Sequence, residues 1–94
     1  MPVGLLTLEL HIAEAQSLKD KRQVLRSLKD RAVNKWNVSV AEVDRQDMWQ
    51  EAVIACVLIS DDHGYTQKAL QQVVGFTEKC WPDLDLLEHH IELI

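Results

Sequence analysis

Positively charged side chains are concentrated in one segment of this 94-residue sequence. Residues 17–35 contain seven Lys and Arg residues and two Asp residues, a net charge of +5; because the whole chain carries −5, the remainder carries −10. At about 100° per residue of an α-helix, four of these cations share one arc: Lys19, Arg22, Arg26 and Lys29. Such a stripe is suited to phosphate groups, above all near a helix N-terminus, where free amides and the helix dipole attract anions.

Two further cations, Lys21 and Arg45, are predicted to complete this phosphate-binding set. Lys21 falls on the apolar side of the same helix, from which it reaches either a shared ligand or the carboxylates of Asp44 and Asp47. Arg45 lies beside those carboxylates in a predicted hairpin loop. The alternative for the whole set is a solvated face with local ion pairs, in which lysine stems cover apolar surface.

Patterns typical of catalysis or metal binding are weak. His89 and His90 are adjacent in a predicted strand, so they point to opposite faces and cannot chelate together. Turn formation explains Asp44 and Asp47, because Asp side chains bond the backbone two residues further on. The sequence contains no nucleophile, zinc or phosphate-loop motif. We therefore expect no enzymatic activity, no metal and no cofactor.

The cysteines and tryptophans are expected to be structural. Cys56 and Cys80 lie in apolar runs without metal-binding spacing and read as free buried thiols, which favours a reducing compartment, the cytoplasm. Trp49 and Trp81 are expected to cover an edge of the core rather than to stack on a ligand. No run approaches the ~20 apolar residues that span a bilayer, so no membrane association is expected.

Hydrophobic periodicity predicts the elements that position these side chains. Residues 3–12 and 36–44 alternate as strands, residues 50–60 resemble a central strand, and residues 83–94 form a last strand. Ser17 begins an amphipathic helix over residues 17–35, and Asp61 or Asp62 begins a second one that ends near residue 80. The apolar stripe of the second helix is predicted to consist of Tyr65, Ala69, Val73, Phe76 and Cys80. The order βαββαβ predicts a single domain, residues 1–94, of the α+β class. We expect a ferredoxin-like, four-stranded antiparallel sheet in the order 4-1-3-2, with two helices on one face.

The sheet face away from the helices is predicted to be apolar. Its outward positions on the first and third strands include Leu5, Thr7, Val53, Ala55, Val57 and Ile59. RNA-recognition sheets stack bases on aromatic residues at such positions, so base readout is not expected here. Exposed apolar patches usually mark an interface, and we expect these residues to pair two copies in a homodimer.

Two motifs carry a resemblance to a known family. SLKDKR at residues 17–22 and NVSVAEVDRQDMWQ at residues 37–50 resemble the YlxP-like family of small bacterial proteins, and the likeness covers essentially the whole chain. The resemblance implies a ferredoxin-like fold, an oligomer and a bacterial cytoplasm. Members are often encoded beside translation and ribosome-maturation genes, which implies a connection with RNA or the ribosome. The family supplies no catalytic residue.

The sequence thus predicts a small cytoplasmic binding protein that contacts structured RNA or the ribosome through phosphates, without sequence specificity. The alternative is a protein-interaction module that forms a homo-oligomer without nucleic acid. In that case the acidic last strand meets complementary proteins through Asp83, Asp85, Glu88 and Glu92. A third class, a ligand-binding regulatory domain, rests on fold analogy alone.

Overall fold

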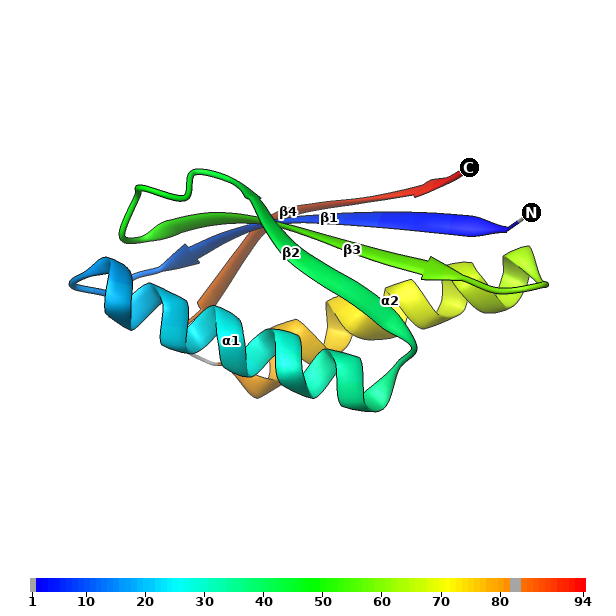
Figure 1. Cartoon of the computed structure of the whole chain (residues 1–94), viewed down its shortest axis with the longest axis horizontal. Helices are drawn as coiled ribbons and strands as arrows, with labels where there is room; N and C mark the ends of the chain where they lie inside the picture. The colour runs from blue at the N-terminus through cyan, green and yellow to red at the C-terminus, as the bar shows by residue number, and fades with distance from the viewer. Residues whose placement is uncertain (1, 82–83) are drawn as a thin grey trace.

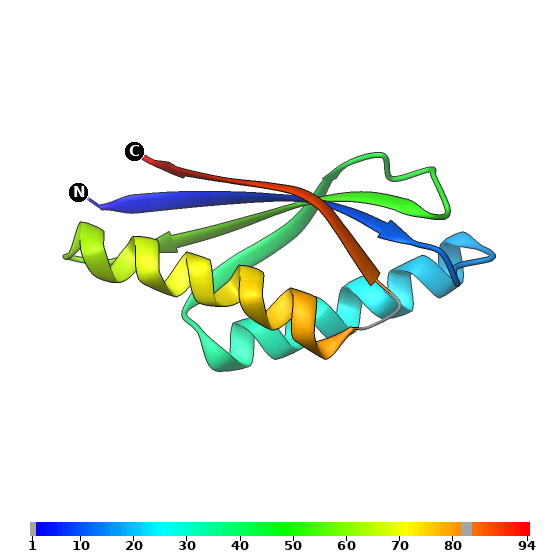
Figure 2. The same cartoon turned by 180° about the vertical axis from the view of Figure 1, so that it is seen from behind.

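The chain forms one antiparallel sheet and two helices in a computed structural model that describes residues 2–81 and 84–94. The elements are β1 (Val3–Ile12), α1 (Leu18–Lys35), β2 (Val38–Asp44), β3 (Glu51–Ile59), α2 (His63–Cys80) and β4 (Leu84–Leu93). The strand order β2-β3-β1-β4 is the predicted order read from the opposite edge. Figures 1 and 2 show both helices on one side of the twisted sheet and the other side uncovered. The predicted α+β class and βαββαβ topology are confirmed.

Alternation along β1 places the core. Leu6, Leu8 and Leu10 are at most 1% exposed and pack beneath the sheet, where Leu28 of α1 and Leu70 of α2 meet them. Burying each leucine contributes roughly 2 kcal/mol relative to leaving it in water. The other face of the sheet, called the open face below, is left without a covering element among the described residues.

Both helices begin at side-chain caps that the sequence predicts. The Ser17 hydroxyl accepts a hydrogen bond from the Asp20 amide at 3.0 Å, and the Asp62 carboxylate accepts one from the Gly64 amide at 2.9 Å. Each cap satisfies one of the amide donors that a helix start leaves free. Along α2 the buried face includes Thr66 and Leu70, whereas Tyr65, expected in the apolar stripe, is 54% exposed.

The two edge strands are irregular. The register of β2 with β3 shifts between Glu42 and Asp44, and that of β1 with β4 shifts between Glu9 and Leu10. One residue of each edge strand is therefore left over as a bulge. The edges of the sheet are twisted locally, and both bulges lie toward the β2–β3 hairpin.

Backbone and side-chain hydrogen bonds fix the hairpin between β2 and β3. Arg45 adopts a left-handed conformation with φ 59°, and its carbonyl accepts from the Met48 amide at 3.1 Å. The Gln50 amide group donates to the carbonyls of Ala13 and Ala15, both at 3.1 Å. The hairpin is thereby tied to the segment that precedes α1. No helix in residues 2–81 or 84–94 is long and apolar enough to cross a membrane.

Candidate functional site

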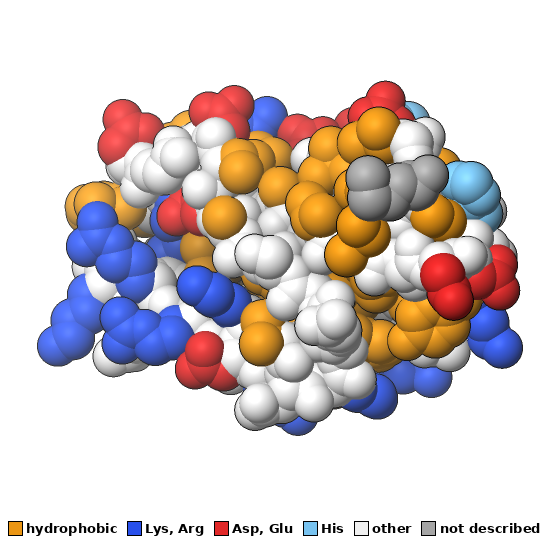
Figure 3. Space-filling view, turned by 45° about the vertical axis from the view of Figure 1, so that its right-hand side comes forward, with side chains coloured by type: hydrophobic (Ala, Val, Ile, Leu, Met, Phe, Trp, Pro, Cys, Tyr) orange, Lys and Arg blue, Asp and Glu red, His pale blue; other side chains and the backbone are white. Residues whose placement is uncertain are grey.

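Four cations form an exposed row on α1, called the basic stripe: Lys19, Arg22, Arg26 and Lys29. They follow one another at spacings of three and four residues, and Lys19 to Lys29 covers ~15 Å of helix. Within the described part of the chain, none of the four makes an ion pair within 4 Å of a carboxylate. Figure 3 shows Lys and Arg side chains gathered at the lower left, over the first half of α1, with carboxylates along the upper edge. The arrangement is as predicted, and the phosphate-binding role of these residues stays a prediction.

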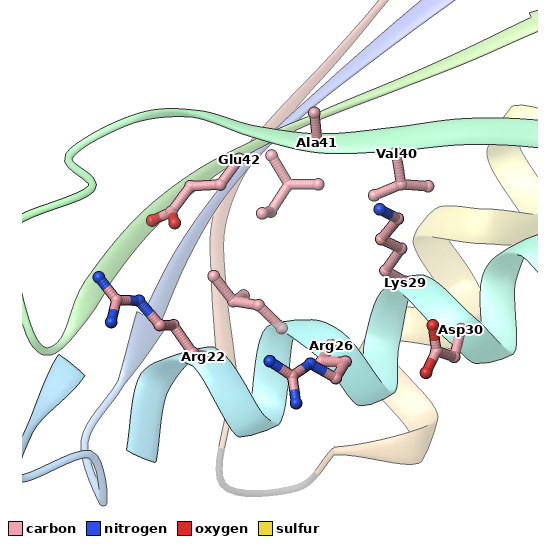
Figure 4. A pocket seen from close by; sticks show the side chains of 9 residues that line it. Arg22, Arg26, Lys29, Asp30, Val40, Ala41 and Glu42 are labelled. Atoms are coloured by element: carbon pink, nitrogen blue, oxygen red, sulfur yellow. The ribbon is translucent and has the colours of Figure 1, made fainter. Parts of the chain in front are cut away.

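A groove of about 550 Å³ runs between the basic stripe and the edge strand β2. Its wall on α1 includes Arg22, Arg26 and Lys29, and Glu42 of β2 stands opposite (Figure 4). The remaining residues that line it are Leu25, Asp30, Val40, Ala41 and Ile54. The groove therefore combines an apolar floor with three cations and two carboxylates at its rim, a net charge of +1.

Lys21 does not belong to this surface, and its predicted role in phosphate binding is wrong. The side chain is 0% exposed, because Lys21 falls on the apolar side of α1 and is enclosed beneath the hairpin. Its ammonium donates to the carbonyls of Arg45 at 2.8 Å and Glu51 at 3.1 Å, and a third carbonyl lies at 3.5 Å. Lys21 therefore holds the hairpin from inside and is closed to an external phosphate.

The partner of Lys21 is a carboxylate that the sequence did not single out. Lys21 Nζ lies 2.8 Å from Glu42 Oε2, whereas the expected partners were Asp44 and Asp47. Glu42 points to the helix side of the sheet, in alternation with Val40, and Asp44 pairs with Val53 beyond the bulge. Among the described residues, Glu42 Oε2 makes no directed hydrogen bond, so the contact is an ion pair held by charge. This oxygen is buried and depends on Lys21 for its compensation.

Arg45 is also removed from the proposed phosphate-binding set. Its guanidinium lies 3.0 Å from Glu9 Oε1, on the open face of the sheet and away from α1. Arg45 follows β2 and Glu9 lies on β1, so the arginine side chain crosses β3 between them. It crosses near Val53, which is paired with both Glu9 and Asp44. The left-handed backbone of Arg45 directs its carbonyl to Lys21 and its side chain to this face.

The predicted interface residues divide into two groups. Val57 is 39% exposed and Ile59 52% exposed. Leu5, Thr7 and Ala55 are half-buried on the same open face. Val53 is 9% exposed, since it lies on the path of Arg45, and including it in an accessible interface is wrong. The remaining five residues form an apolar patch at the end of the open face distant from the hairpin. Whether they pair two copies stays a prediction.

Three aromatic residues lie between the C-terminal parts of α1 and α2. Phe76 meets Trp36 and Trp81 edge to face, with ring centroids 5.3 and 5.5 Å apart. The Arg31 guanidinium lies 4.9 Å from the Trp81 ring, and the Lys35 ammonium lies 5.1 Å from the Trp36 ring. These cations cover rings of their own chain, which stabilises the packing of α1 on α2. Trp81 packs against the core as expected.

Two other structural expectations have different outcomes. Cys56 is buried, and burial raises the pKa of its thiol to about 11, so it stays protonated and unreactive at neutral pH. Trp49, expected to cover an edge of the core, is instead 56% exposed at the hairpin. Asp83, part of the acidic surface proposed from the sequence, lies outside the described residues.

Fold and site together define a small α+β protein with an exposed row of cations on α1 beside the edge strand β2. Its sequence matches the family model described as "Protein of unknown function (DUF503)" over residues 3–91. It is 36% identical to the uncharacterized protein YlxP of Bacillus subtilis (strain 168) over 83 residues, which cover 88% of this chain and 89% of the relative. The chain belongs to the DUF503 family, and the expected resemblance is confirmed.

A solved structure supports the fold alone. The de novo designed protein Foldit4 superposes with a TM-score of 0.56 at 12% sequence identity, over 98% of this chain and 96% of the design. The likeness carries no information about a ligand.

Proposed function

We propose that this protein is a non-enzymatic RNA-binding protein of the bacterial cytoplasm, which contacts structured RNA or the ribosome through the basic stripe and the adjoining groove. The observation that carries the proposal is the set of four exposed cations on one flank of α1, without ion pairs in the described part of the chain. The chain as a whole carries −5, so general attraction to nucleic acid does not explain binding; the local concentration of charge does.

Repulsion between the cations of the basic stripe destabilises α1 as an isolated helix, and this cost supports a role of the stripe in binding. Three neighbouring pairs of like charge stand three or four residues apart: Lys19 with Arg22, Arg22 with Arg26, and Arg26 with Lys29. Each such pair destabilises a helix by about 0.2–0.5 kcal/mol, and Lys19 also faces the positive end of the helix dipole. Phosphates along the groove would offset both effects. The compartment is inferred from two cysteines without a disulfide.

Contacts of this kind read the RNA backbone rather than its bases. Base readout on a sheet needs exposed aromatic residues, and the outward positions of β1 and β3 carry no Phe, Tyr or Trp. Its carboxylates would in addition repel phosphate. Binding is therefore expected to depend on salt, with log K falling against log salt at a slope of about −3 for four contacts.

Cosedimentation with ribosomal particles at low and moderate salt tests the proposal. The variant Arg22→Glu/Arg26→Glu should abolish the salt-sensitive binding. The control Lys68→Glu/Lys79→Glu makes the same charge change at exposed positions of α2 and should bind like the wild type. Equal losses in both variants, or binding by Arg22→Glu/Arg26→Glu, would contradict the proposal. Binding that survives nuclease treatment would identify a protein partner instead.

A second copy of the chain is the other proposed partner. The apolar patch of Leu5, Thr7, Ala55, Val57 and Ile59 is uncovered by the two helices. A two-fold axis through this patch would bury it against itself and keep the carboxylates near the hairpin away from their counterparts. Dimerisation in this form leaves both basic stripes on the outside.

A further inference from the structure

The hairpin end of the open face gathers negative charge. Strand register places five carboxylates there, Glu9, Asp44, Glu51, Asp85 and Glu88. Arg45 and His11 share this end, and with His11 neutral the five carboxylates and one guanidinium sum to −4. Glu9 and Glu88 are direct cross-strand partners, an arrangement of like charges that is unfavourable by itself. This acidic end lies on the side of the sheet opposite to the basic stripe.

An aromatic hollow borders the acidic end. A depression of about 510 Å³ is lined by His11, Met48, Trp49, Gln50 and Glu51. Trp49 is 56% exposed and Met48 41% exposed, so two large apolar side chains face water beside a carboxylate. Exposed tryptophan in a charged surround is typical of binding surfaces, where it supplies a large contact area.

The hollow stands on a rigid support. Lys21 holds the carbonyls of Arg45 and Glu51 from below, and the Gln50 side chain ties the hairpin to the segment before α1. The Ile12 amide also donates to the Gln50 carbonyl at 2.8 Å. Trp49 is thus presented by a loop that is fixed on both sides, and a ligand would not have to order it.

The side chains of the acidic end and the hollow favour a guanidinium group as their ligand. A planar cation stacks on a tryptophan ring and pairs bidentately with carboxylates, whereas phosphate would be repelled. The chain itself provides an example, because the Arg45 guanidinium already lies on Glu9 at 3.0 Å on this face. Among residues 2–81 and 84–94, no three acidic, His or Cys side chains are grouped to hold a metal ion.

We propose that the acidic end binds an extended, arginine-rich segment of a partner protein, with one arginine in the Trp49 hollow and others along Asp85 and Glu88. This surface is separate from the basic stripe and goes beyond RNA binding. Charge complementarity favours a basic segment, and the width of the acidic end over all four strands favours an extended one.

Fluorescence anisotropy with a labelled octapeptide of alternating Arg and Gly tests the proposal. The peptide should bind the wild-type chain, and its Gln-for-Arg counterpart should bind at least about tenfold more weakly. Trp49→Ala should weaken binding about tenfold, while Tyr65→Ala, which removes an equally exposed aromatic ring from α2, should leave it unchanged. Asp85→Asn/Glu88→Gln should weaken binding by at least tenfold, unlike the exposed control pair Asp61→Asn/Glu78→Gln.

Several results would overturn the proposal. Equal binding of the Arg and Gln peptides would do so. Unchanged peptide binding by Trp49→Ala would also do so, once circular dichroism has verified that this variant is folded. If Trp49→Ala and Arg22→Glu/Arg26→Glu both lose self-association, the acidic end binds the basic stripe of a second copy instead. RNA binding should be unaffected by Trp49→Ala, and peptide binding by Arg22→Glu/Arg26→Glu, so the two proposals fail independently.

Discussion

Replacing Lys21 with Met should destabilise the fold severely although it conserves the shape of the side chain. The ammonium is fully buried, lies 2.8 Å from Glu42 Oε2 and donates to the Arg45 and Glu51 carbonyls at 2.8 and 3.1 Å. Removing one member of a buried ion pair leaves the other charge uncompensated, at a cost of about 3–5 kcal/mol. A domain of this size is stable by about 5–15 kcal/mol in total. Lys21→Met is therefore expected to lose a large part of the free energy of unfolding.

Urea unfolding followed by circular dichroism measures this loss, with a double-mutant cycle to isolate the pair. Lys21→Met/Glu42→Met removes both charges, so it should recover much of the stability and leave a cost of about 1–3 kcal/mol for the unsatisfied carbonyls. Lys19→Met, an exposed lysine in the same turn, should change stability by less than about 0.5 kcal/mol. A Lys21→Met variant within about 1 kcal/mol of the wild type would refute the reasoning, as would a double variant no more stable than Lys21→Met.

Four further predictions concern packing, helix propensity, titration and assembly. A Cβ at Gly4 would lie 2.6 Å from both Leu70 Cδ1 and Thr66 Cγ2, so Gly4→Ala should lower the free energy of unfolding in urea by about 1–3 kcal/mol. Gly75→Ala, inside α2 with nothing within 4 Å, should raise it by about 0.5–1 kcal/mol. Because folding raises the Cys56 pKa from 9.0 to about 11, the Cys56 thiol loses its proton at a lower pH in the unfolded chain than in the folded one. Between these two pH values, the free energy of unfolding of the wild type should therefore fall by about 1.4 kcal/mol per pH unit relative to that of Cys56→Ala. Urea unfolding at each pH measures this difference, and parallel curves of unfolding free energy against pH would contradict it. Val57→Lys should shift sedimentation at micromolar concentration from dimer to monomer, whereas Tyr65→Lys on α2 should not; a wild-type monomer would refute the dimer.

Most of the fold could be predicted because its signals are local. Alternation fixed β1 to its observed bounds, and the Ser17 and Asp62 caps set the helix starts. Right-handed connections then left one economical strand order. The bulges at the two edges were not predicted, since an extra residue in a short strand changes the periodicity too little to be recognised. Tyr65 was misassigned because Thr66, a polar residue, takes the buried position and bonds the Ser60 hydroxyl at 2.6 Å.

The candidate site was predictable where it depends on one helix and unpredictable where it depends on contacts between elements. Spacing alone placed four cations on the flank of α1. Burial of Lys21 is a tertiary property, although its position on the apolar side of the helical wheel was a usable signal. Its partner could not be chosen among Glu42, Asp44 and Asp47 without the bulge after Glu42, which turns Asp44 to the open face and leaves Glu42 on the helix side. Pairing of Arg45 with Glu9 crosses an intervening strand and leaves no trace in sequence spacing.

The bulges at the sheet edges affect edge-to-edge association of the protein at high concentration. A free strand edge is a template on which identical strands stack into fibrils. Here β4 carries Asp85, Glu88 and Glu92 along one edge, and the cations of α1 stand beside β2 at the other. Two copies that meet through β4 would bring Asp85, Glu88 and Glu92 against carboxylates of the same sign, which disfavours this pairing. At both edges the bulges interrupt the row of backbone donors and acceptors with which an added strand would pair, so regular strand addition is disfavoured there.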